Sequence, residues 1–362
     1  MNWRENGKRK QKCIGTGLSA SGNNKRKALK IRDSILQEWE SRIAQKTTNI
    51  SFADFLEQWL EIIKPTIAES TYCNYRHTLL GVICPYYAEQ KILLANLTCL
   101  DLQAFYRYRM ESAGISPNTV RHYHAYIHKA LDYAVSSELI SKNPADQVEL
   151  PRKRMHESMC LDADGIRTLI KQAKNTDMEA VVMLAAQFGL RRGEILGLKW
   201  SDFDFVNKLL HIRGVFSRGD GLIYKEPKTN ASKRVFPLTD EMAAYWQSIR
   251  ERQERNKRTL GRHYCLESEA FVCVNSRGHH LTPDYVTRQI PKLCRQCGIN
   301  TVKLHELRHT NISLLLQNGA SLKELQEWAG HSSYTTTADI YAHVQADSKK
   351  KLSYSIQNIL IQ

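Results

Sequence analysis

Apolar side chains recur every three or four positions between residues 52 and 63, at Phe52, Phe55, Leu56, Trp59, Leu60 and Ile63. This spacing places them on one face of an α-helix. Ser51 lies directly before the run and can cap it, with Asp54 in the first turn, and Pro65 ends it. The pattern therefore predicts an amphipathic helix that buries one face.

The same period continues further along the first half of the chain. It predicts helices over residues 70–80 and 99–113, and Ser116-Pro117 opens a fourth helix with proline at its first helical position. This fourth helix carries basic side chains among histidines and tyrosines. It either lies against DNA phosphates and sugars or is an ordinary amphipathic helix with a solvated polar face.

In the second half of the chain, helical runs alternate with short strand-like segments. Helices are predicted over residues 179–188, 192–198, 240–256 and 305–316, with another opening at Thr282-Pro283. Strands are predicted over residues 209–216, 222–225 and 233–237, with Gly219-Asp220-Gly221 turning between the first two. Ser321 and Glu324 form a capping box for a last helix, which Gly330 ends. These elements predict a mainly α fold with a small β-sheet, of the α+β class.

Changes in composition divide the chain into three parts. We expect a basic N-terminal arm at residues 1–48, a helical domain at 49–150, and a larger domain with a C-terminal tail at 151–362. Within the arm, a strand is expected near residues 10–16 and a helix from about residue 25 to 45. The segment from Asn143-Pro144 through Pro151-Arg152-Lys153-Arg154 has two prolines and a basic cluster, which predict a linker that lies across DNA.

Positive charge dominates the chain and is concentrated at the N-terminus. The 362 residues carry a formal net charge of +15, and residues 1–32 contain ten Lys and Arg against one acid, Glu5. A polyanion is the expected partner, although a disordered solubilising tail is the alternative for the arm. The basic side chains expected to contact double-stranded DNA are Lys8, Arg9, Lys10, Lys25, Arg26, Lys27, Arg121, Lys129, Arg152, Lys153 and Arg154.

Nine cysteines are scattered singly, without the spacing of a disulfide framework, and no long apolar run precedes them. We therefore expect a reducing, cytoplasmic compartment and no membrane span. Cys294 and Cys297 are followed by His305 and His309, but the seven residues between the pairs are fewer than the roughly twelve of a zinc finger. Free thiols are the preferred interpretation, and we expect no metal ion.

Six residues of the second half form a set that fits one chemistry. They are Arg191, Lys228, His305, Arg308, His331 and Tyr341. When a phenol attacks a phosphodiester, the anionic phosphorane needs fixed positive charge, which arginine supplies through paired N–H groups. The phenol needs a base and the leaving alkoxide needs an acid. The set predicts attack by a tyrosine without a carboxylate, a metal or another cofactor.

The order of these motifs resembles the tyrosine recombinase family, the phage-integrase class of site-specific DNA recombinases. The resemblance extends over about residues 50–362 and rests on His305-x-x-Arg308, Gly330-His331 and a tyrosine ten positions later. It implies that the helical domain binds core-site DNA and that the N-terminal arm is the end of an arm-binding domain. Either that domain is shortened here or the start codon is misplaced. The pattern is most similar to integrases of temperate phages and of integrative conjugative elements.

The resemblance also implies a role for each residue of the set. Arg191, Arg308 and His331 would bind the phosphate oxygens. Arg191 is preferred over its neighbour Arg192 because it directly follows Gly-Leu, as in the family motif. Glu194 would support the site through an ion pair.

The remaining three residues would move protons and form the covalent bond. His305 would take the phenolic proton or bond the phosphate, Lys228 would protonate the departing 5′ oxygen, and Tyr341 would be the nucleophile. The alternatives are Lys225 and Lys233 for the lysine and Tyr334 for the tyrosine.

The implied protein is an integrase that cuts and rejoins DNA attachment sites through a 3′-phosphotyrosine, without ATP. Four protomers would hold two duplexes, with an excisionase and a DNA-bending protein as accessory partners. A topoisomerase of the related IB class and a DNA-binding regulator that has lost catalysis are the alternatives. Residues 342–362 end in an apolar helical pattern, which would dock on the same domain or on a neighbouring protomer.

Overall fold

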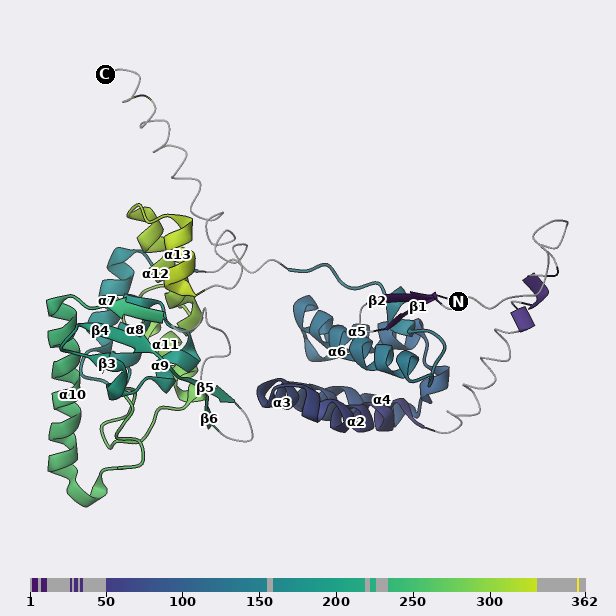
Figure 1. The fold of residues 1–362 in the computed structure, drawn as a ribbon, viewed down its shortest axis with the longest axis horizontal. Coiled ribbons are helices and arrows are strands. Elements are labelled where there is room, and N and C mark those ends of the chain that lie inside the picture. The colour runs from purple at the N-terminus through teal and green to yellow at the C-terminus, as the bar shows by residue number, and fades with distance from the viewer. Residues whose placement is uncertain are drawn as a thin grey trace. The chain divides into compact units, whose positions relative to one another are not determined.

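The computed structural model describes residues 2–5, 8–11, 27, 29–31, 33–34, 50–154, 159–218, 222–225, 234–330 and 357. The chain divides into two compact units, Met1–His156 and Glu157–Gln362 (Figure 1). Helices dominate both units and the strands are short. The fold class predicted from the sequence is therefore confirmed.

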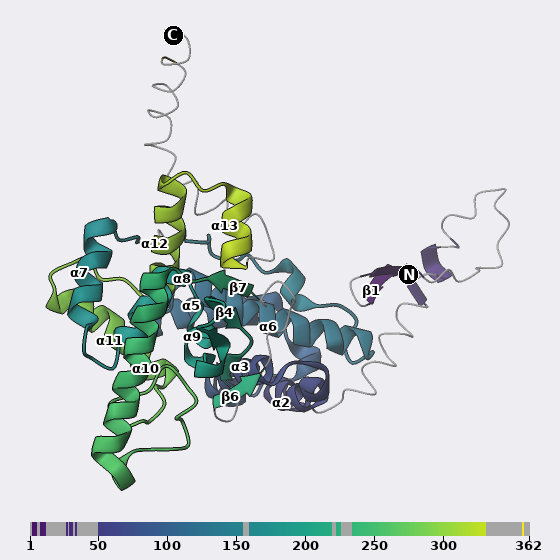
Figure 2. The ribbon, with the colours of Figure 1, turned by 60° about the vertical axis from the view of Figure 1, so that its left-hand side comes forward.

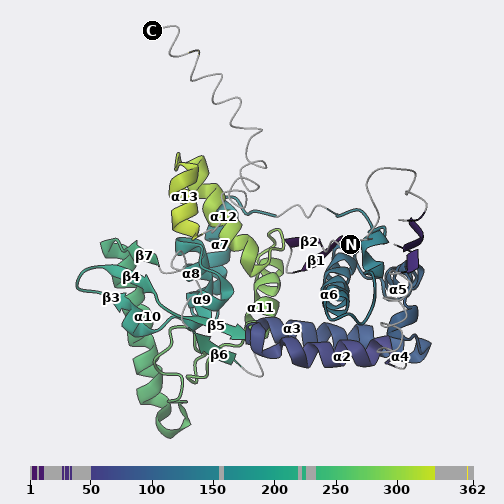
Figure 3. The same cartoon turned by 45° about the vertical axis from the view of Figure 1, so that its right-hand side comes forward.

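The first unit packs its helices around one core. The helices are α2 (Phe52–Ile63), α3 (Glu69–Thr78), α4 (Cys84–Gln90), α5 (Cys99–Ala113) and α6 (Pro117–Ser136), with 3-10 turns at Lys64–Thr66, Leu94–Asn96 and Pro144–Gln147. Figure 3 shows α2 and α3 running side by side. The core is rich in aromatic rings, and Trp59, Tyr87 and Phe105 are almost fully buried in it.

Side-chain caps fix where two of these helices begin. The Ser51 hydroxyl accepts the Asp54 N–H at 3.1 Å, and the Ser116 hydroxyl accepts the Thr119 N–H at 3.2 Å. Each cap pairs a backbone donor that the helix itself leaves without a partner. The predicted starts of α2 and α6 are confirmed.

The helix predicted over residues 70–80 does not end there. It continues through a π-helical turn, Leu79–Ile83, directly into α4. The N–H of Cys84 donates to the carbonyl of Leu79, five residues back, and Pro85 has no N–H to donate. Leu79 and Ile83 are both fully buried, so the wider turn keeps their side chains in the core.

A short hairpin lies at the N-terminus. Strands β1 (Asn2–Glu5) and β2 (Lys8–Gln11) are antiparallel, with Trp3 opposite Lys10. The strand expected near residues 10–16 therefore begins two residues earlier, and its remainder lies outside the described residues. Helical backbone is described at residues 27, 29–31 and 33–34, within the helix expected from about residue 25.

The second unit surrounds α8 (Glu179–Phe188) with other helices. These are α7 (Ala163–Ala173), α9 (Arg192–Gly197), α10 (Asp240–Leu260), α11 (Pro283–Gln296), α12 (Leu304–Gln317) and α13 (Leu322–Ala329), with 3-10 turns at Trp200–Asp202 and Gly261–His263. Seven of the ten residues of α8 are buried and none is fully exposed, as expected of a central helix. Figure 2 shows α12 and α13 side by side at one end of the unit.

The strands of this unit form two sheets rather than one run of three strands. Strands β3 (Phe203–Asp204), β4 (Leu209–Ile212) and β7 (Arg234–Pro237) pair in the order β3-β4-β7, and β5 (Val215–Arg218) pairs with β6 (Leu222–Lys225). The single strand predicted over residues 209–216 is thus wrong, because the chain changes sheets at Gly214. The Tyr224 ring lies so close to Gly214 that an added Cβ would fall 2.0 Å from its hydroxyl oxygen.

Across the described part of the chain, no helix combines the length and the apolar character needed to cross a membrane.

The aromatic core of the first unit gives a stability prediction. Phe105 of α5 is fully buried against Tyr86, Tyr87 and Tyr123, so Phe105→Ala should lower the free energy of unfolding by about 3–5 kcal/mol. Leu100 of the same helix is 69% exposed, and Leu100→Ala should change it by less than about 0.5 kcal/mol. Urea unfolding followed by circular dichroism compares the two variants. Equal losses would mean that the aromatic cluster is not the core of the unit.

Candidate active site

A sharp corner between α8 and α9 places Arg191. Gly189 ends α8 at φ +60°, and its N–H donates to the Ala185 carbonyl at 3.1 Å. A Cβ at Gly189 would lie 2.8 Å from Oδ1 of Asn311, so both the backbone conformation and the space favour glycine. Arg191 follows at the N-cap position of α9, and its predicted place at a helix–helix corner is confirmed.

Helices α12 and α13 contribute the other described parts of the site. His305 and Arg308 lie one turn apart near the start of α12. The capping box of Ser321 and Glu324 at α13 is confirmed, with the Ser321 N–H donating to Oε2 of Glu324 at 2.7 Å. Gly330 ends α13 at φ +62°, as predicted.

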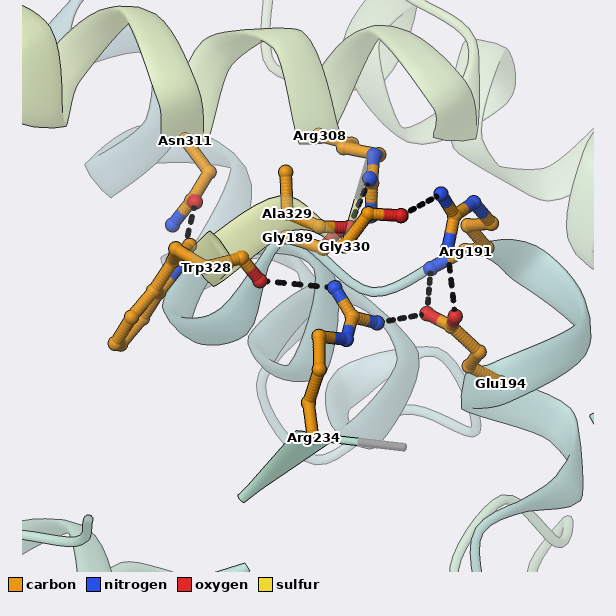
Figure 4. Close-up of polar contacts among 9 residues, drawn as sticks. All are labelled: Gly189, Arg191, Glu194, Arg234, Arg308, Asn311, Trp328, Ala329 and Gly330. Carbon is orange, nitrogen blue, oxygen red and sulfur yellow. Dashed lines mark hydrogen bonds and ion pairs between the residues drawn. The ribbon is translucent and has the colours of Figure 1, made fainter. Parts of the chain in front are cut away.

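Three guanidinium groups meet the last carbonyls of α13, one on each (Figure 4). Nη1 of Arg234 donates to the Trp328 carbonyl at 2.9 Å, Nη2 of Arg308 donates to that of Ala329, and Nη2 of Arg191 donates to that of Gly330 at 2.6 Å. The final carbonyls of a helix have no partner within it and form the negative end of its dipole. Cations are therefore the favoured partners here, and they fix the backbone directly before residue 331.

Glu194 connects two of these arginines. Its carboxylate is 2% exposed, with Oε1 3.0 Å from Nη1 of Arg191 and Oε2 2.6 Å from Nη2 of Arg234. Oε2 also accepts the backbone N–H of Arg191 at 2.8 Å. The expected ion pair of Glu194 is confirmed, and its partner Arg234 was not among the residues singled out from the sequence. Three guanidiniums against one carboxylate leave this cluster positive.

The two arginines expected to bind phosphate differ in exposure. The Arg191 side chain is 38% exposed, whereas Arg308 is 1% exposed and donates through Nη1 to the Gly189 carbonyl at 2.6 Å. Burial lowers the pKa of Arg308 to about 9, and the charges of Arg191 and Arg234 contribute to this lowering. Arg308 is still a cation at neutral pH, so both guanidiniums can stabilise an anion.

His305 lies beside this positive cluster. Partial removal from water lowers its pKa, and the charges of Arg308 and Arg191 lower it further, although the residue keeps an exposed surface. His309 stacks edge-on with it at 4.7 Å between ring centroids, and burial lowers the pKa of His309 to about 4. Because a lowered pKa favours the neutral imidazole, His305 has a lone pair that can accept a proton.

Three residues of the predicted set lie outside the described residues: Lys228, His331 and Tyr341. The alternatives Lys233 and Tyr334 lie outside them too, whereas Lys225 is the last residue of β6. Lys228 belongs to the connection between β6 and β7, and His331 directly follows Gly330. The structure therefore brings together Arg191, His305 and Arg308, and it describes the ends of the segments that carry the other three.

Two glycines let the β5–β6 hairpin lie directly on α9. A Cβ at Gly193 would lie 2.5 Å from the Phe216 carbonyl oxygen, and one at Gly197 would lie 2.9 Å from that of Gly214. Strand and helix backbones are thus in contact, which any larger side chain would prevent. The sequence signal was the pair of glycines four positions apart in α9, and these glycines were not singled out from the sequence.

In the first unit, the end of the predicted linker, Pro151–Arg154, is hydrogen-bonded to α6. Nδ2 of Asn118 donates to the Arg154 carbonyl at 2.8 Å, and the Arg154 N–H donates to Oδ1 of Asn118 at 3.1 Å. Arg121 donates to the Pro151 carbonyl at 3.1 Å. Arg152, Lys153 and Arg154 are exposed beside the first turn of α6. Asn118, too, was not singled out from the sequence.

Two of the three histidines of α6, His124 and His128, have partners within the protein. Nδ1 of His124 lies 3.1 Å from the Tyr106 hydroxyl, and burial lowers the pKa of His124 to about 4. His128 lies between two carboxylates: its Nδ1 is 3.1 Å from Oδ2 of Asp132, and its Nε2 is 2.9 Å from Oδ1 of Asp146. These two histidines are therefore engaged inside the unit rather than free to contact a ligand.

The other predicted DNA contacts are placed as follows. Lys129 is exposed, with Nζ 5.4 Å from the centroid of the Tyr75 ring. Lys8, Arg9 and Lys10 lie on β2, Lys27 is exposed in a helical stretch, and Lys25 and Arg26 lie outside the described residues.

The structure also bears on metal binding. Among the described residues, the His, Cys, Asp and Glu side chains close enough to share an ion are His128, Asp132 and Asp146. The two carboxylates face opposite nitrogens of the imidazole, whereas a metal ion binds one nitrogen, so this group is a hydrogen-bonded one. The Cys297 thiol donates instead to the Leu293 carbonyl at 3.0 Å.

Sequence comparisons agree with the geometry over most of the chain. The model of the phage integrase family matches residues 160–348, more than half of the chain, and that of the phage integrase SAM-like domain matches residues 51–150. A tyrosine recombinase XerC-like protein of Caldanaerobacter subterraneus is 24% identical over 361 residues, covering 94% of this chain and 91% of the relative. The ICEBs1 integrase of Bacillus subtilis is 24% identical over 342 residues, covering 93% and 91%.

Solved structures share the fold. The Tn1549 transposon integrase in complex with circular intermediate DNA has a TM-score of 0.69 at 18% identity, covering 85% of this chain and 100% of that one. A lambda integrase dimer bound to a core site has a TM-score of 0.62 at 17% identity, covering 83% and 79%. With the family model matching the part of the chain that holds Arg191, His305 and Arg308, this chain belongs to the phage integrase family, the tyrosine-type site-specific DNA recombinases of mobile elements.

Proposed function

We propose that this chain integrates or excises a mobile element by cutting DNA at attachment sites with Tyr341 and rejoining the strands through a 3′-phosphotyrosine. One observation carries the proposal. Arg191 and Arg308 converge with His305 on the helix end that directly precedes His331. This arrangement offers fixed positive charge and a neutral imidazole to a single phosphate.

The first step forms one bond and breaks another. The Tyr341 oxygen attacks the scissile phosphorus, His305 takes the phenolic proton, and the 5′ oxygen leaves with a proton from Lys228. Arg191, Arg308 and His331 bind the non-bridging oxygens, whose negative charge grows in the transition state. That positive charge comes from side chains, so the proposed step uses neither a metal ion nor another cofactor.

In the second step, the 5′ hydroxyl of the partner duplex attacks the phosphotyrosine and releases Tyr341. The phosphodiester energy is retained in the protein–DNA ester, so strand exchange needs no ATP. Four protomers on two synapsed attachment sites, helped by an excisionase and a DNA-bending protein, would carry out both exchanges in the cytoplasm. The C-terminal tail, residues 342–362, would dock on a neighbouring protomer.

The proposed domain roles follow the same division. Residues 49–150 bind core-site DNA, residues 151–362 hold the catalytic site, and the basic arm at residues 1–48 contacts more distant DNA. The related Tn1549 and lambda integrases are described in complex with DNA, which supports duplex DNA as the partner. The exposed Arg152, Lys153 and Arg154, fixed on α6, provide a rigid set of phosphate contacts.

The nucleophile is tested with a nicked core-site duplex that traps the covalent intermediate. Tyr341→Phe removes the attacking oxygen, so it should bind this DNA with unchanged affinity and form no adduct that survives denaturant. Tyr334→Phe, the matched variant, should form the adduct at the normal rate. The reverse result would assign the nucleophile to Tyr334. If the unaltered chain forms no adduct at all, the protein is a DNA-binding regulator.

The role of His305 as the base gives a pH prediction. A base acts in its neutral form, and the pKa of His305 is lowered, so the rate should be level near neutral pH and fall as pH decreases. With DNA below saturation, the half-maximal pH should lie below about 6.5, the ordinary value for histidine. In His305→Gln this fall in rate at low pH (the acid limb of the pH profile) should disappear. In His263→Gln, a change at an exposed histidine, it should remain. An unchanged limb in His305→Gln would remove His305 from the proton transfer.

The attachment of the linker to α6 gives a binding prediction. Asn118→Ala removes both hydrogen bonds to Arg154, so the dissociation constant for core-site DNA should rise about tenfold, since a short segment must then be ordered on binding. The exposed Asn74→Ala should leave it unchanged. Replacing Arg152, Lys153 and Arg154 by alanine should reduce the salt slope of binding by about 0.9 for each phosphate that the protein no longer neutralises.

In a chain that already lacks those three basic side chains, Asn118→Ala should raise the dissociation constant for core-site DNA little further. The residues that Asn118 orders no longer bind phosphate in that chain. Full additivity of the two changes would show that Asn118 acts on α6 itself and not on the linker.

A further inference from the structure

We propose that Arg234 is a positioning residue of the recombination site, which sets the orientation of Arg191 and of the backbone that leads into His331. This inference rests on the function proposed above and adds a residue to it. Arg234 is the first residue of β7 and is 8% exposed, so it is not placed to touch DNA itself.

The first route of action runs through Glu194. Oε2 of Glu194 receives both Nη2 of Arg234, at 2.6 Å, and the backbone N–H of Arg191, at 2.8 Å. The other oxygen, Oε1, receives the Arg191 guanidinium at 3.0 Å. Arg234 therefore fixes the carboxylate that holds Arg191 at two points.

Charge makes this route sensitive to the loss of Arg234. Glu194 is 2% exposed, and a buried carboxylate requires compensating charge. Without Arg234, Arg191 alone would compensate it. The Arg191 guanidinium would then be drawn toward Glu194 and away from the solvent-facing position where it can meet a phosphate.

The second route runs through the end of α13. Nη1 of Arg234 donates to the Trp328 carbonyl at 2.9 Å, next to the carbonyls of Ala329 and Gly330 that bind the other two arginines. The same strand supports the same residue, because the rings of Phe236 and Trp328 meet edge-on at 4.7 Å. Strand β7 thus fixes the last turn of α13 (Figure 4).

The two routes meet at the residues that bind the phosphate. Arg191 donates to the Gly330 carbonyl, so the guanidinium and the backbone before His331 are fixed relative to each other. Arg234 is connected to both partners of this contact, through Glu194 and through the neighbouring carbonyl. A shift of Arg234 would therefore displace two groups that bind the phosphate.

The test compares arginine-to-lysine changes at two ion pairs of the same unit, each of which has a buried carboxylate. Arg234→Lys keeps the charge but cannot make both bonds, because an ammonium lacks the planar fork of a guanidinium. Arg252→Lys is the matched control, since Arg252 binds the buried Glu179 at 2.6 Å through the same kind of pair and lies on α10, outside the site. Both proteins are full-length, and rates are normalised to the folded fraction measured by thermal unfolding.

We expect Arg234→Lys to slow formation of the covalent adduct by about 10- to 100-fold under single-turnover conditions, with the DNA dissociation constant changed less than about twofold. This is less than the roughly 10²- to 10³-fold cost of removing a donor that touches the developing charge. Arg252→Lys should cleave at the normal rate. A normal rate for Arg234→Lys would overturn the proposal.

A second substrate separates positioning from general destabilisation. A methylphosphonate at the scissile position lacks one charged non-bridging oxygen. Its transition state therefore carries less negative charge and needs less stabilisation by the arginine guanidiniums. If Arg234 acts through Arg191, then Arg234→Lys and Arg191→Lys should both lose much less activity on this substrate than on the phosphodiester, and the double variant should resemble Arg191→Lys alone. Equal losses on both substrates, or full additivity, would reduce Arg234 to a structural residue.

The controls also keep this test apart from that of the proposed function. If the unaltered chain forms no adduct with the phosphodiester, the recombinase function itself fails. If it forms the adduct and Arg234→Lys behaves like Arg252→Lys, only the role of Arg234 is wrong.

Discussion

The second unit holds three guanidinium groups close together despite the repulsion between their positive charges. The end of α13 makes this possible, because three successive carbonyls at the negative end of a helix each accept one arginine. Glu194 neutralises part of the charge from the opposite side. Removing any one of these partners would leave buried charge without compensation, which proteins tolerate poorly.

This arrangement explains why the cluster keeps a net positive charge that can bind an anion. Carbonyl dipoles orient the guanidiniums but do not cancel their charge, and the single carboxylate offsets one of three. An arginine has five N–H donors, so the contacts made by Arg191 leave further donors for a phosphate. The electrostatic stabilisation is therefore built into the folded protein before DNA binds, which is the condition for it to lower a barrier.

Local sequence signals predicted the helices well, because caps and periodicity act over a few residues. Ser51, Ser116 and Ser321 all cap the helices they were expected to cap. The long strand at 209–216 was wrong because its end is set by Tyr224, a residue from the next strand. The motif order pointed to Arg191, His305 and Arg308, whereas Arg234 and Asn118 could not be found this way. Their importance comes from partners 40 and 36 positions away, Glu194 and Arg154, that adjoin them only in the fold.

In the proposed mechanism, the same charges would also connect phosphate binding with proton transfer. In the free protein, partial burial and then the charges of Arg308 and Arg191 lower the pKa of His305, which keeps the imidazole neutral and ready to accept a proton. A bound phosphate brings negative charge to these arginines and reduces their effect on His305. In the proposed mechanism, the pKa of His305 would then rise toward its ordinary value, and the imidazole would become a stronger base when the scissile phosphate is in place. One group of arginines would thus stabilise the phosphorane and restrict the basicity of His305 to the DNA complex.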